Sequence, residues 1–287
     1  MFINPEKVPV TVYRSDDADA PRLDHSANSI ATIFKACLVT GYGSKKGAGW
    51  TIPYEDTVKG IRVLRPKISL EHDFYLRLSN DNGKQMTAQV YLDMTEINIG
   101  DLKLQCDTPF KYNFGVANTR WVLIACDRAF VFFSELPNNN GIKTENSGVY
   151  FYCGDTSKNT SGDRAIYLKH TGGTWSENDD DRSHLFDNQQ YSSTIGKLYE
   201  TKVKRGIATD PVSLFTGSKI VSAKNLLCPS IITSTDEIYF IPLFSASRNT
   251  QDNYTVVSDF DRDFIVHSTT SYQSANNVYV PIDYWEF

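Results

Sequence analysis

The sequence lacks any apolar run long enough to cross a membrane. Its longest uninterrupted apolar stretches are Trp121–Cys126 and Ala129–Phe133, whereas a membrane-spanning helix takes about 20 residues. The opening Met-Phe-Ile-Asn-Pro-Glu-Lys has neither the basic region nor the apolar region of a secretory signal. These absences predict a protein that is made and kept in solution, with no membrane partner.

Cysteine is scarce and is not spaced for metal binding or redox catalysis. The five cysteines are odd in number and none belongs to a Cys-x-x-Cys pair, which argues against a zinc knuckle and a thioredoxin-type site. Cys37, Cys126 and Cys153 have apolar neighbours, so we predict that they fill space in the core. This usage is typical of a protein synthesised in a reducing compartment.

An excess of positive charge is also missing. Lysine and arginine total 29 while aspartate and glutamate total 34, so the formal net charge is −5. Sequence-independent binding of nucleic acid depends on basic residues that neutralise phosphates. We therefore expect no direct nucleic-acid role.

Aromatic and β-branched residues are abundant, and Gly and Asn interrupt them at short intervals. Aromatic residues make up 13% of the chain, and the pattern is typical of many short strands joined by turns. The predicted fold is mainly β, with antiparallel strands arranged as in a sandwich or a barrel. One amphipathic helix is expected near residues 28–40, because Ile30, Ile33, Phe34 and Cys37 share one helical face.

The helix and two hairpins can be placed in more detail. Ser26 or Asn28 is a candidate cap for the start of the helix, and Gly41 for its end. One hairpin is predicted to join 74–78 to 87–92 through a tight Asn-Gly turn. A second joins the two apolar runs at 121–125 and 129–133, and we expect it at the centre of the fold because both of its faces are apolar.

A polar stretch from Pro137 to Gly148 separates the predicted strands into two groups. It divides an N-terminal α+β region, 1–137, from a β-rich region, 148–287. The alternative is one continuous domain in which this stretch is a hairpin loop. Its length and polarity also suit an exposed functional loop.

Two motifs resemble ligand sites but are incomplete. The glycine-rich stretch Gly41–Gly49 follows the predicted helix, whereas a phosphate-binding loop precedes one, so we expect a connector there. Asp259, Asp261 and Asp263 form the D-x-D-x-D opening of a calcium loop, without the Gly and Glu that should follow. They are kept as weak metal candidates, and a solvated strand face is the simpler interpretation.

Catalytic signatures are absent from the sequence. The histidines have no metal-ligand spacing such as H-E-x-x-H, and there is no G-x-S-x-G nucleophile motif. We therefore predict no enzymatic activity, no catalytic residue and no cofactor.

Several segments resemble a family of tailed-bacteriophage particle proteins of unsettled biochemical role. The resemblance is specific in the first ~50 residues and looser beyond them. In both parts the segments follow the family's order: Val12–Pro21, Cys37–Lys45, Ala48–Thr51, Trp121–Phe130, Phe151–Asp155, Gly162-Asp163, Arg205-Gly206 and Asp283–Trp285. The chain departs from the family after Arg205-Gly206, where Ile-Ala-Thr-Asp-Pro211 replaces a Pro-Gly-Leu turn and a histidine.

The resemblance implies a structural component of a virion, made in the bacterial cytoplasm and located in the tail or at the head–tail junction (the neck). Its partners would be other virion proteins, and such subunits commonly form homo-oligomeric rings. We expect the glycine-rich loop and two polar loops to make these contacts. The candidate interface residues are Gly41, Tyr42, Gly43, Lys45, Trp50, Asn138, Asn139 and Trp175.

Two other interpretations compete with an assembly role. A receptor-binding or glycan-binding β module would use exposed loop aromatics such as Trp175 to stack on sugars. A particle-associated hydrolase would need a pair of carboxylates in a cleft, and their separation depends on the fold and not on sequence spacing.

Overall fold

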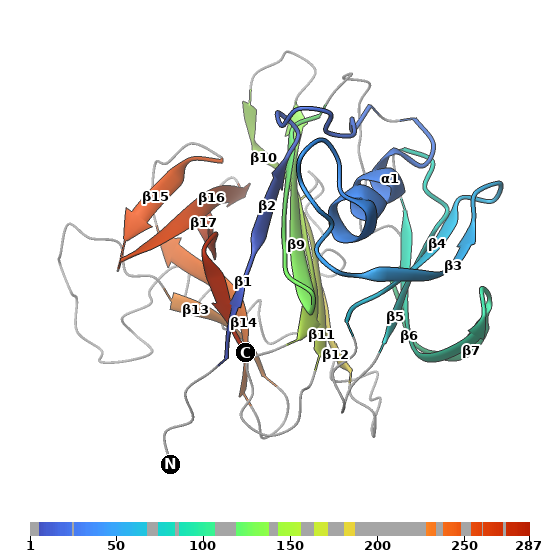
Figure 1. The fold of residues 1–287 in the computed structure, drawn as a ribbon. Helices are drawn as coiled ribbons and strands as arrows, with labels where there is room; N and C mark the ends of the chain where they lie inside the picture. The colour runs from blue at the N-terminus through green and yellow to red at the C-terminus, as the bar shows by residue number, and fades with distance from the viewer. Residues whose placement is uncertain are drawn as a thin grey trace.

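In a computed structural model, the chain forms a mainly antiparallel β structure with one short helix (Figure 1). This confirms the predicted fold class. The structure describes residues 6–24, 26–67, 74–83, 86–106, 119–137, 143–155, 164–171, 181–186, 228–233, 238–247, 254–259, 261–271 and 274–287. No helix in these ranges is long and apolar enough to span a bilayer.

The middle layer is a six-stranded sheet with the order β12-β11-β10-β9-β8-β2. Its strands are β2 (Thr11–Arg14), β8 (Trp121–Ala125), β9 (Ala129–Pro137), β10 (Lys143–Asp155), β11 (Arg164–Thr171) and β12 (Asp181–Phe186). The strands β8 and β9 form the predicted central hairpin, which turns through Cys126 and places the amide of Cys126 on the carbonyl of Ala129 at 2.9 Å.

Successive residues of the central hairpin enter two different cores. Phe130 and Phe132 pack with the helix on one face, while Val131 and Phe133 pack on the other face against the C-terminal strands. All four are fully buried. Because side chains alternate along a strand, a sheet covered on both faces needs apolar residues at every position. The continuous apolar runs are explained by this arrangement.

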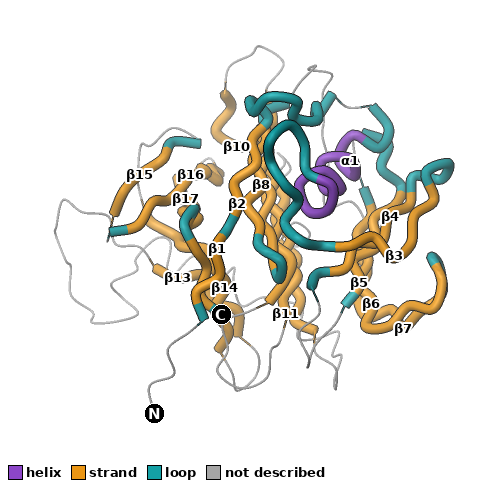
Figure 2. Tube along the Cα trace, viewed as in Figure 1, coloured by secondary structure: helices purple, strands orange, loops and turns teal. Residues whose placement is uncertain are grey.

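The first core lies between the central sheet and a five-stranded N-terminal sheet with the order β3-β4-β5-β6-β7. Its strands are β3 (Thr51–Asp56), β4 (Ile61–Arg65), β5 (Tyr75–Ser79), β6 (Thr87–Glu96) and β7 (Ile99–Cys106). The helix α1 (Ser29–Lys35) continues into a π-helical turn, η1 (Ala36–Thr40), and packs in this core. Figure 2 shows the helix in purple beside these strands.

The helix follows its predicted face. Ile30, Ile33, Phe34 and Cys37 are all fully buried. Its end is also as expected: Gly41 has φ 78° and donates its amide to the carbonyl of Ala36 at 2.7 Å. The buried face and the end of the helix therefore follow from the local sequence.

The predicted start of the helix needs correction. Asn28 occupies the N-cap position with φ 68°, but its side chain makes no capping hydrogen bond. The carboxylate of Asp81 performs this role from the β5–β6 connection, accepting the amide of Ala31 at 2.8 Å and that of Gly83 at 2.9 Å. The predicted tight Asn-Gly turn is therefore wrong: Ser79 pairs with Thr87, and the longer connection between them carries the cap.

The second core joins the central sheet to the C-terminal strands. These are β13 (Cys228–Thr233), β14 (Ile238–Ser247), β15 (Val256–Asp259), β16 (Arg262–Ser271) and β17 (Ser274–Pro281), in the order β13-β14-β17-β16-β15. A separate ribbon pairs β1 (Lys7–Pro9) with β18 (Tyr284–Glu286), so the two ends of the described chain lie side by side. Trp285 of this ribbon is fully buried against Tyr152.

The polar stretch proposed as a domain boundary, Pro137–Gly148, runs from the end of β9 into the start of β10. These strands are paired neighbours in the central sheet, and their register includes Lys143 opposite Pro137. The stretch therefore connects two strands of one sheet.

Candidate functional site

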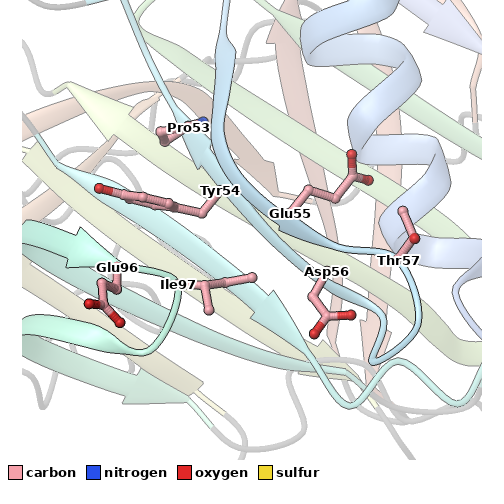
Figure 3. A pocket seen from close by; sticks show the side chains of 7 residues that line it. All are labelled: Pro53, Tyr54, Glu55, Asp56, Thr57, Glu96 and Ile97. Atoms are coloured by element: carbon pink, nitrogen blue, oxygen red, sulfur yellow. The ribbon is translucent and has the colours of Figure 1, made fainter.

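An open groove lies at the outer end of the N-terminal sheet, between strand β3 and the turn that joins β6 to β7. It has a volume of about 610 Å³ and is lined by Pro53, Tyr54, Glu55, Asp56, Thr57, Glu96 and Ile97. Figure 3 shows the β3 residues along one wall and Glu96 and Ile97 along the other. We refer to these seven residues as the β3 groove.

A hydrogen bond across the sheet holds the two walls of the groove together. The hydroxyl of Tyr54 donates to the carbonyl of Met94, 3.0 Å away on β6. The ring of Tyr54 and the side chain of Ile97 pack against a small cluster on the outer face of the sheet, formed by Val63, Tyr75, Tyr91 and Met94. The apolar part of the groove is thus supported from below by packed side chains.

The three carboxylates of the groove differ in their hydrogen-bond partners and in their exposure. Glu55 turns toward the helix, where it accepts hydrogen bonds from Lys35 at 2.7 and 2.9 Å and from Arg62 at 3.1 Å. Burial alone would raise the pKa of Glu55, but these cations outweigh it and hold the pKa below its ordinary value. Asp56 accepts the amide of Lys59 at 2.9 Å, and Glu96 is exposed.

Exposed aliphatic side chains lie on the β3–β4 turn and on strand β7, next in sequence to the segments that line the groove. Val58, at the tip of the β3–β4 hairpin, is 94% exposed, and Ile99 and Leu102 of β7 are 55% and 44% exposed. In the part of the chain that the structure describes, Val256 is the one other large aliphatic side chain exposed to this degree. Exposed apolar side chains that form one patch mark interaction surfaces, whereas isolated ones are common on any protein.

The glycine-rich loop, predicted as an interface, covers an edge of the central sheet. Strand β2 is the last strand of that sheet, and Lys45 donates to its Val12 carbonyl at 2.7 Å. The amide of Arg14 donates to Asp17 at 2.7 Å and to the hydroxyl of Tyr42 at 3.2 Å. Unpaired backbone groups on an edge strand invite pairing with another chain, and this loop occupies them. In Figure 2 the loop is the teal segment that leads into β3.

Three side chains of this edge cover form one polar cluster. Tyr42 and Lys45 both donate to the carboxylate of Asp17, at 2.7 and 2.6 Å. Burial alone would raise the pKa of Asp17, but these donors and the Arg14 amide bring it below its ordinary value. Burial and the bond to Asp17 raise the pKa of Tyr42 well above its ordinary value, so its hydroxyl keeps its proton. The cluster is satisfied within the chain.

Trp50 does not lie on the surface, contrary to its selection as an interface residue. It is 3% exposed, its ring packs edge-on against Phe74 and Phe130, and its indole nitrogen donates to the carbonyl of Cys126 at 3.0 Å. Gly41, Tyr42 and Lys45 are partly buried, and Gly43 is exposed. Asn138, Asn139 and Trp175 lie outside the described residues.

The three candidate metal aspartates are spread over a hairpin turn. Asp259 ends β15 and pairs with Arg262, Asp261 lies in the turn with φ 58°, and Asp263 accepts a hydrogen bond from Ser258. The expectation that they share one strand face is therefore wrong. Across the described ranges, no group of three or more His, Cys, Asp or Glu side chains is placed to hold a metal ion.

Three cysteine predictions are confirmed. Cys37, Cys126 and Cys153 are buried free thiols, and burial raises the pKa of Cys126 to about 12. They are packing residues in the two cores.

The groove itself was not predicted from the sequence. Its two walls come from segments about forty residues apart, such as Tyr54 and Met94, so no local pattern contains it. One local signal was present: aliphatic residues stand inside the polar turns Asp56–Gly60 and Glu96–Gly100. Val58 and Ile99 of these segments are exposed, whereas Ile97 packs against the cluster below the groove.

The fold and the groove together define a layered antiparallel β protein with an apolar and acidic surface at one end. No known sequence family, curated protein or solved structure matches the chain.

Proposed function

We propose that this protein is a structural subunit of a tailed-bacteriophage particle, located in the tail or the neck, that acts through protein–protein contacts. The observation that carries the proposal is the open β3 groove, together with exposed Val58, Ile99 and Leu102 on the β3–β4 turn and on β7. Protein interfaces combine an apolar centre with a polar rim, and the exposed Glu96 and Lys59 supply charge beside these side chains.

The hairpins that carry this surface are held firmly, which suits an assembly role. Glu55 is bonded to Lys35 of the helix and to Arg62 of β4, and Tyr54 is bonded to Met94 of β6. A surface that is ordered before binding loses less conformational entropy when a partner docks. The resemblance of Val12–Pro21 and Cys37–Thr51 to the phage family supports the assignment to a phage particle.

The proposal is tested by quantitative mass spectrometry of particles purified on a density gradient. We expect a copy number that is a small multiple of three or six, because neck and tail components form symmetric rings. Hundreds of copies would place the protein on the capsid and overturn the tail or neck location. Absence from the particle would overturn the proposal itself.

A second candidate function is a glycan-binding module. Tyr54 presents a ring in an open groove beside the carboxylates of Asp56 and Glu96, a combination that suits stacking and hydrogen bonding to a sugar. A glycan array is the direct measurement: binding lost in Y54A would favour this function, and no binding above background would remove it.

A further inference from the structure

We propose that the β3–β4 hairpin tip of one copy docks in the β3 groove of a second copy, so that the protein forms a two-fold symmetric dimer. This inference rests on the proposed function, since it names a partner for the same surface.

The tip of the hairpin projects Val58 and Lys59, which we call the knob. Val58 is 94% exposed, and the side chain of Lys59 beside it is 70% exposed. The turn is fixed at its base, where Asp56 accepts the amide of Lys59 at 2.9 Å. Gly60 is buried with φ 65°, and a Cβ there would lie 2.1 Å from the side-chain oxygen of Asn28, so the hairpin rests directly against the start of the helix.

The groove offers chemistry that suits these two side chains. Tyr54 and Ile97 offer apolar surface to a valine, and the exposed carboxylate of Glu96 borders it for a lysine. Asp56 lies 3.9 Å from Lys59 of its own chain, so Glu96 is the carboxylate assigned to the lysine of the second copy. Val58 and Lys59 are the exposed side chains at the end of the tip, so charge substitutions at these two positions test the contact directly.

The occupant is a second copy because each chain carries both halves of the contact. Val58 does not fill the groove of its own chain, since it remains 94% exposed although its neighbour Thr57 lines the groove. Knob and groove therefore belong to one continuous patch. When one patch contains both complementary parts, two copies can satisfy each other about a two-fold axis.

The experiment is sedimentation velocity of the purified full chain over a wide concentration range. We expect wild-type protein to pass from monomer to dimer as concentration rises, and V58D to remain monomeric because it places a charge in the apolar contact. V256D is the matched control, since Val256 is exposed on the C-terminal sheet. It should dimerise as wild type does, and far-UV circular dichroism should show that both variants are folded.

A charge exchange tests whether the contact is made between chains. K59E alone would place a carboxylate against Glu96, and E96K alone would place a lysine against Lys59, so each variant should be monomeric. An equimolar mixture of K59E and E96K should dimerise. In the mixed dimer the introduced glutamate faces the introduced lysine, and the unchanged Lys59 of one chain faces the unchanged Glu96 of the other. A mixture that stays monomeric would overturn the inference, as would monomeric wild type at every concentration or equal loss in V256D.

The failure of this inference can be distinguished from failure of the proposed function. If wild type is monomeric but V58D is excluded from purified particles, the groove serves another virion protein and only the dimer is overturned. If wild type dimerises but is absent from particles, the structural role in the virion is overturned while the self-association stands.

Discussion

Trp50 lies in the first core, with its ring against Phe74 and Phe130 and its indole N–H donating to the carbonyl of Cys126. These partners come from two segments, one just before β5 and the other the β8–β9 hairpin. The side chain combines a large apolar area with one polar atom that has a buried acceptor. Tryptophan is well suited to such a place because its one donor can be satisfied while the rest of the ring is packed.

Replacing Trp50 should lower the free energy of unfolding in two steps. W50F keeps an aromatic ring but leaves the Cys126 carbonyl without its donor, at a cost of about 1–3 kcal/mol. W50A also creates a cavity, at a cost of about 3–5 kcal/mol. Urea unfolding followed by circular dichroism measures both, with V58A as the exposed control. Unchanged stability in W50A would contradict the core position.

Asp17 should make the fold sensitive to acid. Its pKa is lower in the folded chain than in the unfolded one, so the unfolded chain binds this proton more readily. The stabilisation is therefore present above the ordinary carboxyl pKa and is lost as pH falls through the folded pKa. We expect D17N to be less stable than wild type at about pH 7, with the difference shrinking toward about pH 3. D16N, at the exposed neighbouring position, is the control; a difference independent of pH would contradict this assignment.

At the scale of elements, the start of helix α1 depends on the loop that joins β5 to β6 in the N-terminal sheet. The carboxylate of Asp81 accepts the Ala31 amide across a separation of 50 residues. Burial raises the pKa of Asp81, although backbone amides of Ala31, Gly83 and Ile30 counteract part of this increase. The helix and the N-terminal sheet are thereby joined by hydrogen bonds as well as by packing.

Removing this cap should destabilise the fold. We expect D81A to lower the free energy of unfolding by about 2 kcal/mol, because helix amides lose their acceptor in a buried place. D81N keeps one side-chain oxygen and should cost less. D93N, on exposed β6 surface, serves as the control for loss of a carboxylate. Thermal and urea unfolding give the values, and D81A with wild-type stability would rule out a capping role.

The same helix shows which parts of an element follow from local sequence. Its buried face was predicted correctly because the spacing of Ile30, Ile33, Phe34 and Cys37 is set by helical geometry alone. Its cap was not, because Asp81 is 50 residues away in the sequence and reaches the helix through the tertiary fold. Trp50 was misplaced for a similar reason: a glycine-rich stretch resembles a surface loop until its tertiary partners are known.

At the scale of the whole molecule, the central sheet is shared by both cores. Adjacent residues of β9 enter opposite cores, so displacement of this strand would disturb the packing of both. The double apolar pattern of β8 and β9 made the central position predictable. The β3 groove was not predictable, since it depends on how two hairpins from distant parts of the chain end beside each other.

Unfolding should therefore be a single cooperative transition. F130A removes a side chain from the first core and I265A removes one from the second. We expect each to cost about 2–5 kcal/mol and to shift the same transition, seen at the same urea concentration by tryptophan fluorescence and by circular dichroism. Two separate transitions, each moved by one variant alone, would show that the cores unfold independently.

The paired ends of the chain have a consequence for how the molecule responds to force. Glu6 and Phe287 exchange two backbone hydrogen bonds, at 3.0 and 3.1 Å, and the pairs of Lys7 with Glu286 and Val8 with Trp285 follow them along the ribbon. Tension applied through residues 6 and 287 would load these residue pairs one after another, which is the unzipping geometry. Strands opened in this way yield at lower force than strands sheared along their length, so the ribbon would open while the central sheet stays intact.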